Sequence, residues 1–421
     1  MLGGMEQLRI ASHYEQLLGL GNGWRVEDVE LDHAAREVRI RVAAKREALR
    51  CPECEADCPG YDRRERRWRH LDTMQYRTIL IAAIPRVECA AHGRKQIRVP
   101  WAEEGSRFTA LFEALVIDWL QEGSFAAVAD LLRLSWDQVA GIQDRAVQRG
   151  LARRETVQPE RIGVDETSFQ KRHEYVTTVT DLDGKLLYVA DDRRRESLDG
   201  FFQSLGPEGC EKLQAIAMDM WSPYIESARA HVPAADAKIV FDKFHLAKHL
   251  GDAVDRVRRA ENKELRAQGD DRLVKTKYLW LTNPAHMSRK QRDAFGQVQT
   301  SRLKVARAWA IKEAGMLLFG YAKRGWAERM WQRWCDWAIR SRLEPVKRVA
   351  RMIRKHWQGV INAATMSVTN AMSESLNSKI QWIKRRACGY RNRERFRNAI
   401  YFHLGGLDLY PANLRSTHTK A

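Results

Sequence analysis

The stretch that decides the fold is RIGVDETSFQ, residues 161–170, where helical patterns give way to short apolar runs. The later runs of this kind each end in a turn or an acid: YVTTVTDLDGKLLYVADD (175–192), LQAIAMDMWSPY (213–224) and AKIVFDKFH (237–245). Runs of this length bounded by turn signals are typical of β-strands, and Asp183-Gly184 predicts a hairpin turn. Helical segments separate the later runs. The pattern therefore predicts a mixed sheet with helices on its faces.

Two of these runs end in a carboxylate, because Asp165 follows RIGV and Asp219 follows LQAIAM. Open sheets place their sites where the carboxyl ends of the strands emerge, so we expect the two side chains to be neighbours. A third isolated acid, Glu374, lies in the helical stretch TNAMSESLNSKI, which begins at residue 369. Glu166 should point to the opposite face of its strand, so it is not predicted as a ligand.

These three carboxylates predict a site for hard divalent cations. Mg²⁺ prefers oxygen ligands and keeps several waters, so two or three carboxylates suffice for a pair of ions, and Mn²⁺ is a possible substitute. Two such ions about 4 Å apart can activate a water or a 3′-hydroxyl and stabilise the leaving oxygen of a phosphoryl transfer. We therefore predict that Asp165, Asp219 and Glu374 bind metal and are catalytic.

Basic residues follow Glu374 on the same predicted helix. They are Lys379, Lys384, Arg385 and Arg386. We expect them to contact a phosphate backbone, although a solvated helix face is the alternative for any single charge. A second basic run, Arg193 to Arg195, is either ordinary surface or a DNA contact.

The composition indicates a polyanionic partner. The chain has 421 residues, a net charge of +18 and a pI of about 9.7. Such a charge attracts nucleic acid or an anionic membrane, but no run approaches the roughly 20 apolar residues of a spanning helix. The N-terminus lacks a signal-peptide pattern, and seven cysteines do not suggest a disulfide framework. We therefore expect a cytoplasmic protein that binds DNA or RNA and no membrane.

Two short motifs near the N-terminus predict a zinc site. They are Cys51-x2-Cys54 and, after a segment of β pattern, Cys89-x2-His92. Two such motifs supply the four ligands of a tetrahedral Zn²⁺ ion. Metal binding would also contribute folding free energy, which a small β module lacks because its core is small. Cys58 could replace one ligand, and His70 is the other possible ligand. Unligated buried thiols are the alternative.

The stretch SFAAVADLLRLSWDQVAGIQDRAV, residues 124–147, predicts a helix-turn-helix. It gives a short helix, a turn at Leu134-Ser135 and a longer helix that begins at an N-cap serine. The second helix would enter the major groove of DNA, which places Ser135 and Gln138 at the predicted interface. A three-helix arrangement without DNA binding is the alternative.

A long helical region rich in tryptophan follows the predicted strands. Trp331, Trp334 and Trp337 are spaced by three and should lie along one face of a helix. The stripe is either core packing or a surface that stacks on bases.

Over nearly its whole length the chain resembles a known family, on motifs that are specific in combination. They are CPEC with VECAAHG, VPWAEEGSRFT, IGVDETSF, MDMWSPY with VFDKFHLAKHL, and SVTNAMSESLNSKI. It resembles the ISL3 family of bacterial insertion-sequence transposases. The resemblance implies an RNase H-like catalytic domain with an acidic triad at Asp165, Asp219 and Glu374, interrupted by an all-helical insertion.

The resemblance also bears on two histidines. DKFH resembles the (C/D)xxH motif of related transposases, which implies that His245 orients a carboxylate or the scissile phosphate, unless it is structural. Many relatives have two cysteines in the second zinc knuckle where this chain has Cys89 and His92, and this departure leaves the ligand set less certain.

The predicted fold is multidomain α+β and α/β. The predicted parts are an N-terminal hairpin region around DHAARE (1–50), a zinc-binding β module (51–100), a helix-turn-helix domain (105–155), an RNase H-like mixed-sheet catalytic domain (160–245 with 365–405) and a helical insertion (246–364).

The predicted function is that of a transposase. The chain would bind the terminal inverted repeats of its element and catalyse Mg²⁺-dependent strand cleavage and transfer into target DNA. It would act as a homodimer or larger oligomer on DNA, at the nucleoid of a bacterium. The alternatives are a non-catalytic DNA-binding regulator derived from a transposase and an RNase H-like repair nuclease.

Overall fold

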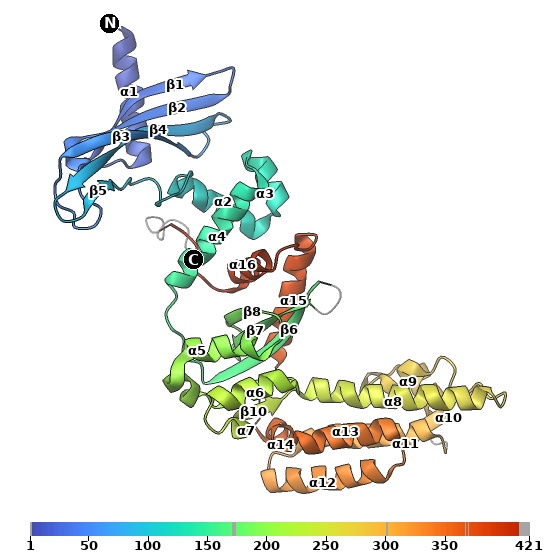
Figure 1. Ribbon diagram of the computed structural model, residues 1–421. Coiled ribbons are helices and arrows are strands. Elements are labelled where there is room, and N and C mark those ends of the chain that lie inside the picture. The colour runs from blue at the N-terminus through green and yellow to red at the C-terminus, as the bar shows by residue number, and fades with distance from the viewer. Residues whose placement is uncertain (1, 171–173, 300–301, 367, 369, 412–421) are drawn as a thin grey trace. The chain divides into compact units, whose positions relative to one another are not determined.

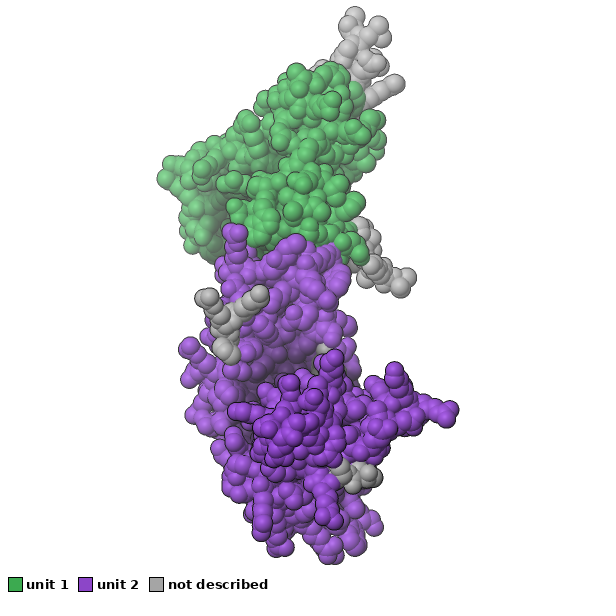
Figure 2. Space-filling view, turned by 90° about the vertical axis from the view of Figure 1, so that its right-hand side faces the viewer, with its two compact units in different colours: residues 1–154, 407–421 green, residues 155–406 purple. Residues whose placement is uncertain are grey.

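The structure is a computed structural model that describes residues 2–170, 174–299, 302–366, 368 and 370–411, without the side chains of residues 2–9, Ala371 and Glu374. The chain forms two compact units (Figure 2). Unit 1 contains residues 1–154 and 407–421, and unit 2 contains residues 155–406. The finer division of the chain at the predicted domain boundaries stays a prediction.

Unit 1 begins with a helix and a five-stranded sheet (Figure 1). The elements are α1 (Leu2–Leu18), β1 (Trp24–Asp32), β2 (Glu37–Ala44), β3 (Gly60–Arg69), β4 (Arg77–Cys89) and β5 (Gly93–Gln96). The order is β1-β2-β4-β3, and β5 pairs with β4. The predicted hairpin is confirmed, since β1 and β2 pair antiparallel on either side of DHAARE. One face of the sheet buries Ile40, Trp68 and Leu80.

The sequence did not predict α1 or β3. β3 reads GYDRRERRWR, and arginines on both faces of the strand conceal its alternation. Only Trp68 and Arg69 of this strand are buried. It is held by its antiparallel pairing with β4, in which Trp68 lies opposite Leu80.

The predicted helix-turn-helix is confirmed as local structure. It comprises α2 (Ala110–Glu122), α3 (Phe125–Leu132) and α4 (Trp136–Ala152). Ser124 caps α3 and Ser135 caps α4, and Arg133 takes the left-handed conformation that turns the chain between them. Ser135 and Gln138 form a complete capping box, since each side chain accepts a hydrogen bond from the backbone N–H of the other.

Unit 2 contains the predicted mixed sheet. Its strands are β6 (Arg161–Gln170), β7 (Glu174–Asp181), β8 (Leu186–Asp191), β9 (Ala215–Met218) and β10 (Ile239–Phe241). The order is β10-β9-β6-β7-β8; β6, β7 and β8 pair antiparallel, and β9 and β10 run parallel to β6. This is the order of an RNase H-like sheet, as the resemblance implied.

Helices cover both faces of this sheet (Figure 1). They are α5 (Arg195–Lys212), α6 (Ser222–His231), α7 (Ala235–Lys238), α15 (Ala371–Arg386) and α16 (Arg393–Leu404). Ile162 and Val164 of β6 pack in one core with Leu198 of α5 and Tyr224 of α6. Successive side chains of a strand alternate between faces, so Gly163, Asp165 and Thr167 face α15 on the other side.

The remainder of unit 2 is helical between β10 and α15. The elements are α8 (Lys243–Arg266), α9 (Lys277–Leu281), α10 (Arg289–Gln299), α11 (Lys304–Leu317), α12 (Arg324–Arg340), α13 (Glu344–Lys355) and α14 (Trp357–Thr365), with 3₁₀ turns at Pro284–His286 and Leu318–Gly320. None of the helices in the described ranges is long and apolar enough to span a membrane.

The tryptophan stripe of α12 is mainly core. Trp331 and Trp334 are buried, and the Trp334 indole donates to the carbonyl of Ile311 at 2.8 Å. The expectation that Trp337 shares their face is wrong, because this side chain is 43% exposed. Six residues turn a helix by about 600°, which places Trp337 roughly 120° away from Trp331.

Candidate active site, zinc centre and DNA interface

Asp165 and Asp219 lie at the same edge of the sheet of unit 2. β6 and β9 are parallel neighbours in which Gly163 lies opposite Ala217, so the next two residues of each strand bring Asp165 level with Asp219. Asp165 is 8% exposed. Burial raises the pKa of the Asp165 carboxyl to about 7, with a smaller contribution from the negative charge of Asp219. A carboxyl that ionises with difficulty by itself is stabilised as a carboxylate by a bound cation.

The carboxyl group of Asp165 has neutral hydrogen-bond donors. The amide of Asn377 on α15 donates to its Oδ2 at 2.8 Å, and the backbone N–H of Glu166 donates to its Oδ1 at 2.7 Å. These bonds fix the orientation of the carboxyl group. They leave its negative charge without a cationic side chain in direct contact among the described residues.

α15 approaches β6 closely because residue 163 is glycine. A Cβ atom at Gly163 would lie 2.6 Å from both Asn370 Oδ1 and Ser373 Oγ, so a larger residue would push α15 away. Ser373 Oγ donates to Asn370 Oδ1 at 2.6 Å and lies 3.2 Å from Thr180 Oγ1 of β7. These contacts set the start of α15 against β6 and β7.

Glu374 lies on α15, but its side chain is outside the described part of the structure. Helix positions three and four apart share a face. The backbone of Glu374 therefore lies on the face of α15 that carries Asn370 and Asn377, and Asn377 contacts Asp165. The backbone of this predicted third ligand thus lies on the face of α15 that packs on β6, and its coordination stays a prediction.

His245 lies within contact distance of two carboxylates. Its Nδ1 is 2.6 Å from Asp219 Oδ1 and 3.2 Å from Asp242 Oδ2. The contacts with Asp219 and then Asp242 raise the pKa of His245 to about 10. Asp242 is buried, follows β10 and caps α8 by accepting from the N–H of Phe244.

These three residues could themselves hold a metal, because Asp219, Asp242 and His245 offer ligand atoms that all lie within 4.8 Å of one another. The sequence pattern does not predict Asp242 as a ligand. The available signal is its position, since Asp242 directly follows the apolar strand β10 as Asp219 follows β9.

An open pocket of about 440 Å³ lies between β6 and α15. It is lined by Thr167, Asn377, Ser378, Gln381 and Arg385. The lining offers amide, hydroxyl and guanidinium groups, which are suited to a polar, anionic substrate.

The predicted basic residues of α15 divide into two kinds. Lys379 and Arg385 are exposed. Lys384 donates to the carbonyl of Ser168 on β6 at 2.9 Å, and burial lowers its pKa. Arg386 packs over the ring of Trp382. Lys379 and Arg385 are therefore the freer of the four for a phosphate contact.

The predicted zinc ligands converge in unit 1. Cys51, Cys54, Cys89 and His92 present ligand atoms that all lie within 4.8 Å of one another. Cys54 Sγ is 3.7 Å from Cys89 Sγ, and His92 Nδ1 is 3.6 Å from Cys89 Sγ. The backbone N–H of His92 lowers the pKa of the Cys89 thiol to about 7, which favours the thiolate that zinc requires.

The two alternative ligands lie outside this group. Cys58 Sγ donates to the carbonyl of Ala56 at 3.3 Å. The ring of His70 contacts Thr109 at 2.9 Å, and burial lowers the pKa of His70 to about 4. His70 therefore links the sheet of unit 1 to the first residues of the helix-turn-helix, and three cysteines with one histidine form a set that fits tetrahedral zinc.

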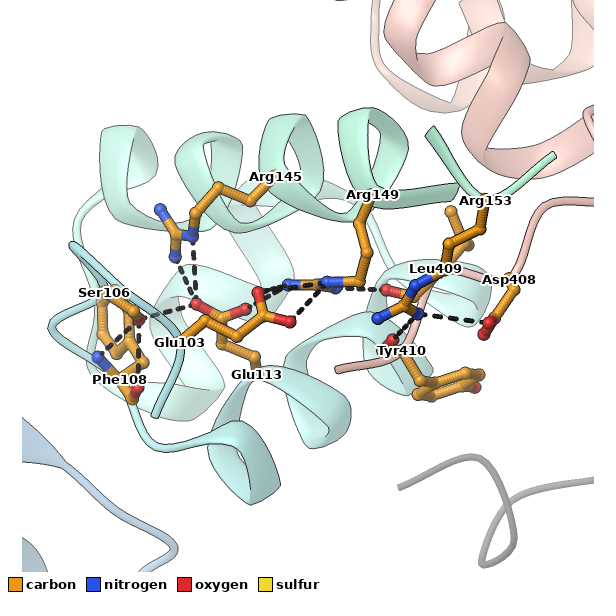
Figure 3. A network of polar contacts seen from close by, with 10 residues as sticks. All are labelled: Glu103, Ser106, Phe108, Glu113, Arg145, Arg149, Arg153, Asp408, Leu409 and Tyr410. Atoms are coloured by element: carbon orange, nitrogen blue, oxygen red, sulfur yellow. Dashed lines mark hydrogen bonds and ion pairs between the residues drawn. The ribbon is translucent and has the colours of Figure 1, made fainter. Parts of the chain in front are cut away.

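The inner side of helix α4 is held by a charged network (Figure 3). Glu113 of α2 is buried and accepts from Arg145 at 2.6 Å, Arg149 at 3.0 Å and the Ser106 hydroxyl at 2.8 Å. Glu103 adds a second carboxylate to Arg149 at 2.9 Å. Two carboxylates thus balance two arginines of the predicted recognition helix.

Residues 407–411 complete this network, and no pattern in the sequence predicts this role for them. The carbonyl of Leu409 accepts from Arg149, and Arg153 Nη1 contacts Asp408 at 3.1 Å and the carbonyl of Tyr410 at 2.6 Å (Figure 3). Leu407 lies so close to Gly150 that a Cβ atom there would be 2.6 Å from Leu407 Cβ. The segment is thus part of the helix-turn-helix body.

The opposite side of α4 is available to a partner at its N-terminus. Trp136 is 46% exposed, and Gln138 is also exposed. The capping box occupies the Gln138 amide oxygen and the Ser135 hydroxyl. The NH₂ group of Gln138 is therefore better placed to read a base than Ser135 is.

Comparisons with known proteins agree with this architecture. A family model described as transposase matches residues 162–400, the helix-turn-helix domain of transposase family ISL3 matches residues 97–147, and the zinc-finger of transposase IS204/IS1001/IS1096/IS1165 matches residues 47–92. The chain is 27% identical over 405 residues to the transposase for insertion sequence element IS1001 of Bordetella parapertussis, across 94% of this chain and 98% of that protein. It is 28% identical over 414 residues to the transposase for insertion sequence element IS1557 of Mycobacterium tuberculosis, across 90% of this chain and 92% of that protein.

Proposed function

Because the chain belongs to the ISL3 family of insertion-sequence transposases, we propose that it binds the ends of its own element and cuts and joins DNA there with a divalent cation. The observation that carries this proposal is the sheet edge of unit 2. There Asp165 and Asp219 end up level on neighbouring strands, and α15 is packed against the first of them.

In this proposal Asp165, Asp219 and Glu374 hold Mg²⁺, and Mn²⁺ can replace it. A divalent cation held there would supply activation of the attacking water or 3′-hydroxyl and stabilisation of the leaving oxygen. Asn377 would orient the carboxyl group of Asp165, and a bound cation would favour the ionised form of that group. His245 would orient Asp219 through the contact of its Nδ1 with the carboxylate, which would hold that ligand in position for the metal.

Asp242 offers a second arrangement for the same chemistry. If the cation lies among Asp219, Asp242 and His245, the histidine must first lose the proton that the two carboxylates stabilise. The oxygen ligands that Mg²⁺ prefers favour the site with Asp165. Replacement of Asp242 separates the two arrangements, since it should abolish cleavage only if Asp242 is a direct ligand.

Unit 1 supplies recognition of DNA. Zn²⁺ at Cys51, Cys54, Cys89 and His92 would tie the β4–β5 turn to the loop before β3. The N-terminal end of α4 would enter the major groove of the terminal inverted repeat, with Gln138 at the bases and arginines on phosphates. Target DNA and a second or further copy of the chain would complete the assembly, at the bacterial nucleoid in the cytoplasm.

The test is a cleavage and strand-transfer assay with labelled DNA of the element ends. The purified full-length chain should cut and join this DNA in Mg²⁺ or Mn²⁺, and not in EDTA. Scrambled end DNA is the matched control and should be cut much less. A zinc-loaded, folded chain that binds the element ends but cuts no DNA with either cation would overturn the proposed chemistry. That result would favour the alternative function, a non-catalytic DNA-binding regulator.

A further inference from the structure

Three consecutive arginines lie after β8, and the structure gives them different environments. The side chain of Arg194 is 77% exposed, and its nearest carboxylate, Asp192, is 3.9 Å away. Arg195 is 46% exposed and pairs with Asp199 at 3.5 Å within α5. Arg193 is 31% exposed and is held by three other side chains. Of the three arginines, Arg193 is the one whose side chain is fixed by its neighbours.

The guanidinium group of Arg193 packs on two aromatic rings. Its Cζ atom lies 4.2 Å from the ring centroid of Tyr175 and 4.6 Å from that of Trp221. The indole N–H of Trp221 also donates to the backbone carbonyl of Arg193 at 2.9 Å. Trp221 thus holds both the backbone and the side chain of this residue, which reduces the entropy that Arg193 would lose on binding a ligand.

Glu166 orients the same guanidinium group from its edge. Arg193 Nη1 donates to Glu166 Oε1 at 3.0 Å, and Glu166 is the one carboxylate in the described part of the chain within ion-pair distance of Arg193. Arginine has five N–H donors in a planar fork. Nε and Nη2 have no acceptor within the ranges that the structure describes, so one edge of the fork remains for a ligand.

This cluster borders the candidate active site. Glu166 follows Asp165 on β6, and Trp221 is the second residue after Asp219. Because side chains alternate along a strand, Glu166 points to the opposite face of the sheet from Asp165. Arg193 is therefore not among the predicted metal ligands. It follows β8, which runs parallel to β6, so it lies at the same end of the sheet, where its ligand would also lie.

We propose that Arg193 binds a backbone phosphate of the DNA strand adjacent to the phosphate that is cut, and that Tyr175, Trp221 and Glu166 hold it ready to do so. The inference rests on the proposed function, since it assumes that DNA lies along this edge. A planar guanidinium fork matches phosphate oxygens in a bidentate contact. Arg193 is a positioning residue that contacts substrate, whereas Arg194 and Arg195 are ordinary surface residues.

The experiment compares Arg193→Ala and Arg193→Lys with Arg194→Ala in the full-length, zinc-loaded chain. Single-turnover cleavage is measured against the concentration of end DNA. Loss of a charge-assisted contact should raise the half-saturating DNA concentration of Arg193→Ala roughly tenfold or more, with a smaller change in the maximal rate. Lysine should rescue little, because an ammonium group is not a planar fork. Arg194→Ala should stay within about twofold.

The salt dependence of DNA binding gives a readout that a merely structural role would not change. Removing one phosphate contact should lower the slope of log affinity against log salt by about one for Arg193→Ala and leave it unchanged for Arg194→Ala. Glu166→Gln should keep or strengthen DNA binding, because it frees Arg193 and removes a negative charge near phosphate. If Glu166→Gln and Arg193→Ala instead lowered thermal stability and DNA binding alike, the pair would be structural only.

The outcomes separate this inference from the proposed function. Unchanged half-saturation and an unchanged salt slope for Arg193→Ala, with normal cleavage by the unaltered chain, would overturn the role of Arg193 alone. An unaltered chain that cuts no DNA would overturn the proposed chemistry. In that case the salt slope of binding still decides whether Arg193 contacts phosphate.

Discussion

Each unit contains a buried carboxylate with a different set of partners. Glu113 in unit 1 is 1% exposed and contacts two arginines and a serine hydroxyl. Asp165 in unit 2 is 8% exposed and receives hydrogen bonds from an amide and a backbone N–H. The first charge is neutralised by side chains of the same unit, and the hydrogen bonds to the second come from neutral donors among the described residues.

This difference separates a structural carboxylate from a candidate catalytic one. A buried ion pair with its own arginines holds elements in place and has no reason to bind a further cation. A buried carboxyl with a raised pKa and neutral donors gains most from a metal ion. The predicted zinc ligands in unit 1 are a third case. Their four ligand atoms already lie close together, so the binding of a metal would require little rearrangement.

The largest expected effect is on cleavage. Asp165→Ala should lower the single-turnover cleavage rate by about a thousandfold or more, because a metal ligand is lost. Asp219→Ala and Glu374→Ala should behave alike. Zinc content and binding of end DNA should persist, and binding could tighten as a negative charge near phosphate is removed. Glu196→Ala, an exposed acid on α5, is the control. A cleavage rate of Asp165→Ala within tenfold of that of the unaltered chain would show that Asp165 is not a catalytic metal ligand.

The next effect concerns the zinc group. Cys54→Ser should lower the zinc content from about one ion per chain, measured by elemental analysis, and abolish preferential binding of terminal-repeat DNA in gel shifts. The sheet of unit 2 should stay folded. Cys58→Ser is the matched control and should retain zinc, because Cys58 lies outside the four converging ligands. Zinc loss from Cys58→Ser instead would change the assigned ligand set.

Glu113→Gln tests the structural carboxylate. It leaves Arg145 and Arg149 with one fewer negative charge and should lower the free energy of unfolding by about 3 kcal/mol, measured by denaturant titration. Cleavage of DNA that is already bound should change little. Glu122→Gln, an exposed acid on the same helix, should be neutral. Equal free energies of unfolding for the two variants would show that the charged network makes no net contribution to stability.

The smallest effect is expected at His245. His245→Asn removes the partner that orients Asp219 and should slow cleavage roughly ten- to a hundredfold, with a higher Mg²⁺ concentration for half-maximal rate. His286→Asn, an exposed histidine outside the site, is the control. An unchanged metal requirement would mean that His245 acts only on the fold.

Local signals made much of this fold predictable. Asp165 and Asp219 are predictable because each follows an apolar run of sequence, and Ser135 is predictable because helix caps have a short signature. The expectation that a strand ends at Asp165 is wrong, because β6 continues through it to Gln170 by pairing with β7. The charged strand β3 lacks such a signal, since its partner β4 determines its conformation. Asp242 was left out because its DKFH context suggested only a role for the histidine. The contact of Arg149 with Leu409 joins residues 260 apart, and no local pattern encodes it.

That last contact also bears on how the protein is made. A ribosome releases the helix-turn-helix sequence long before residues 407–411, so α4 first exists without the carbonyl of Leu409 and the carboxylate of Asp408. A chain that stops before residue 407 keeps the residues of α4 that face DNA but leaves Arg149 and Arg153 short of acceptors. The protein therefore cannot complete its DNA-recognition module until the catalytic sheet and all its helices have been synthesised.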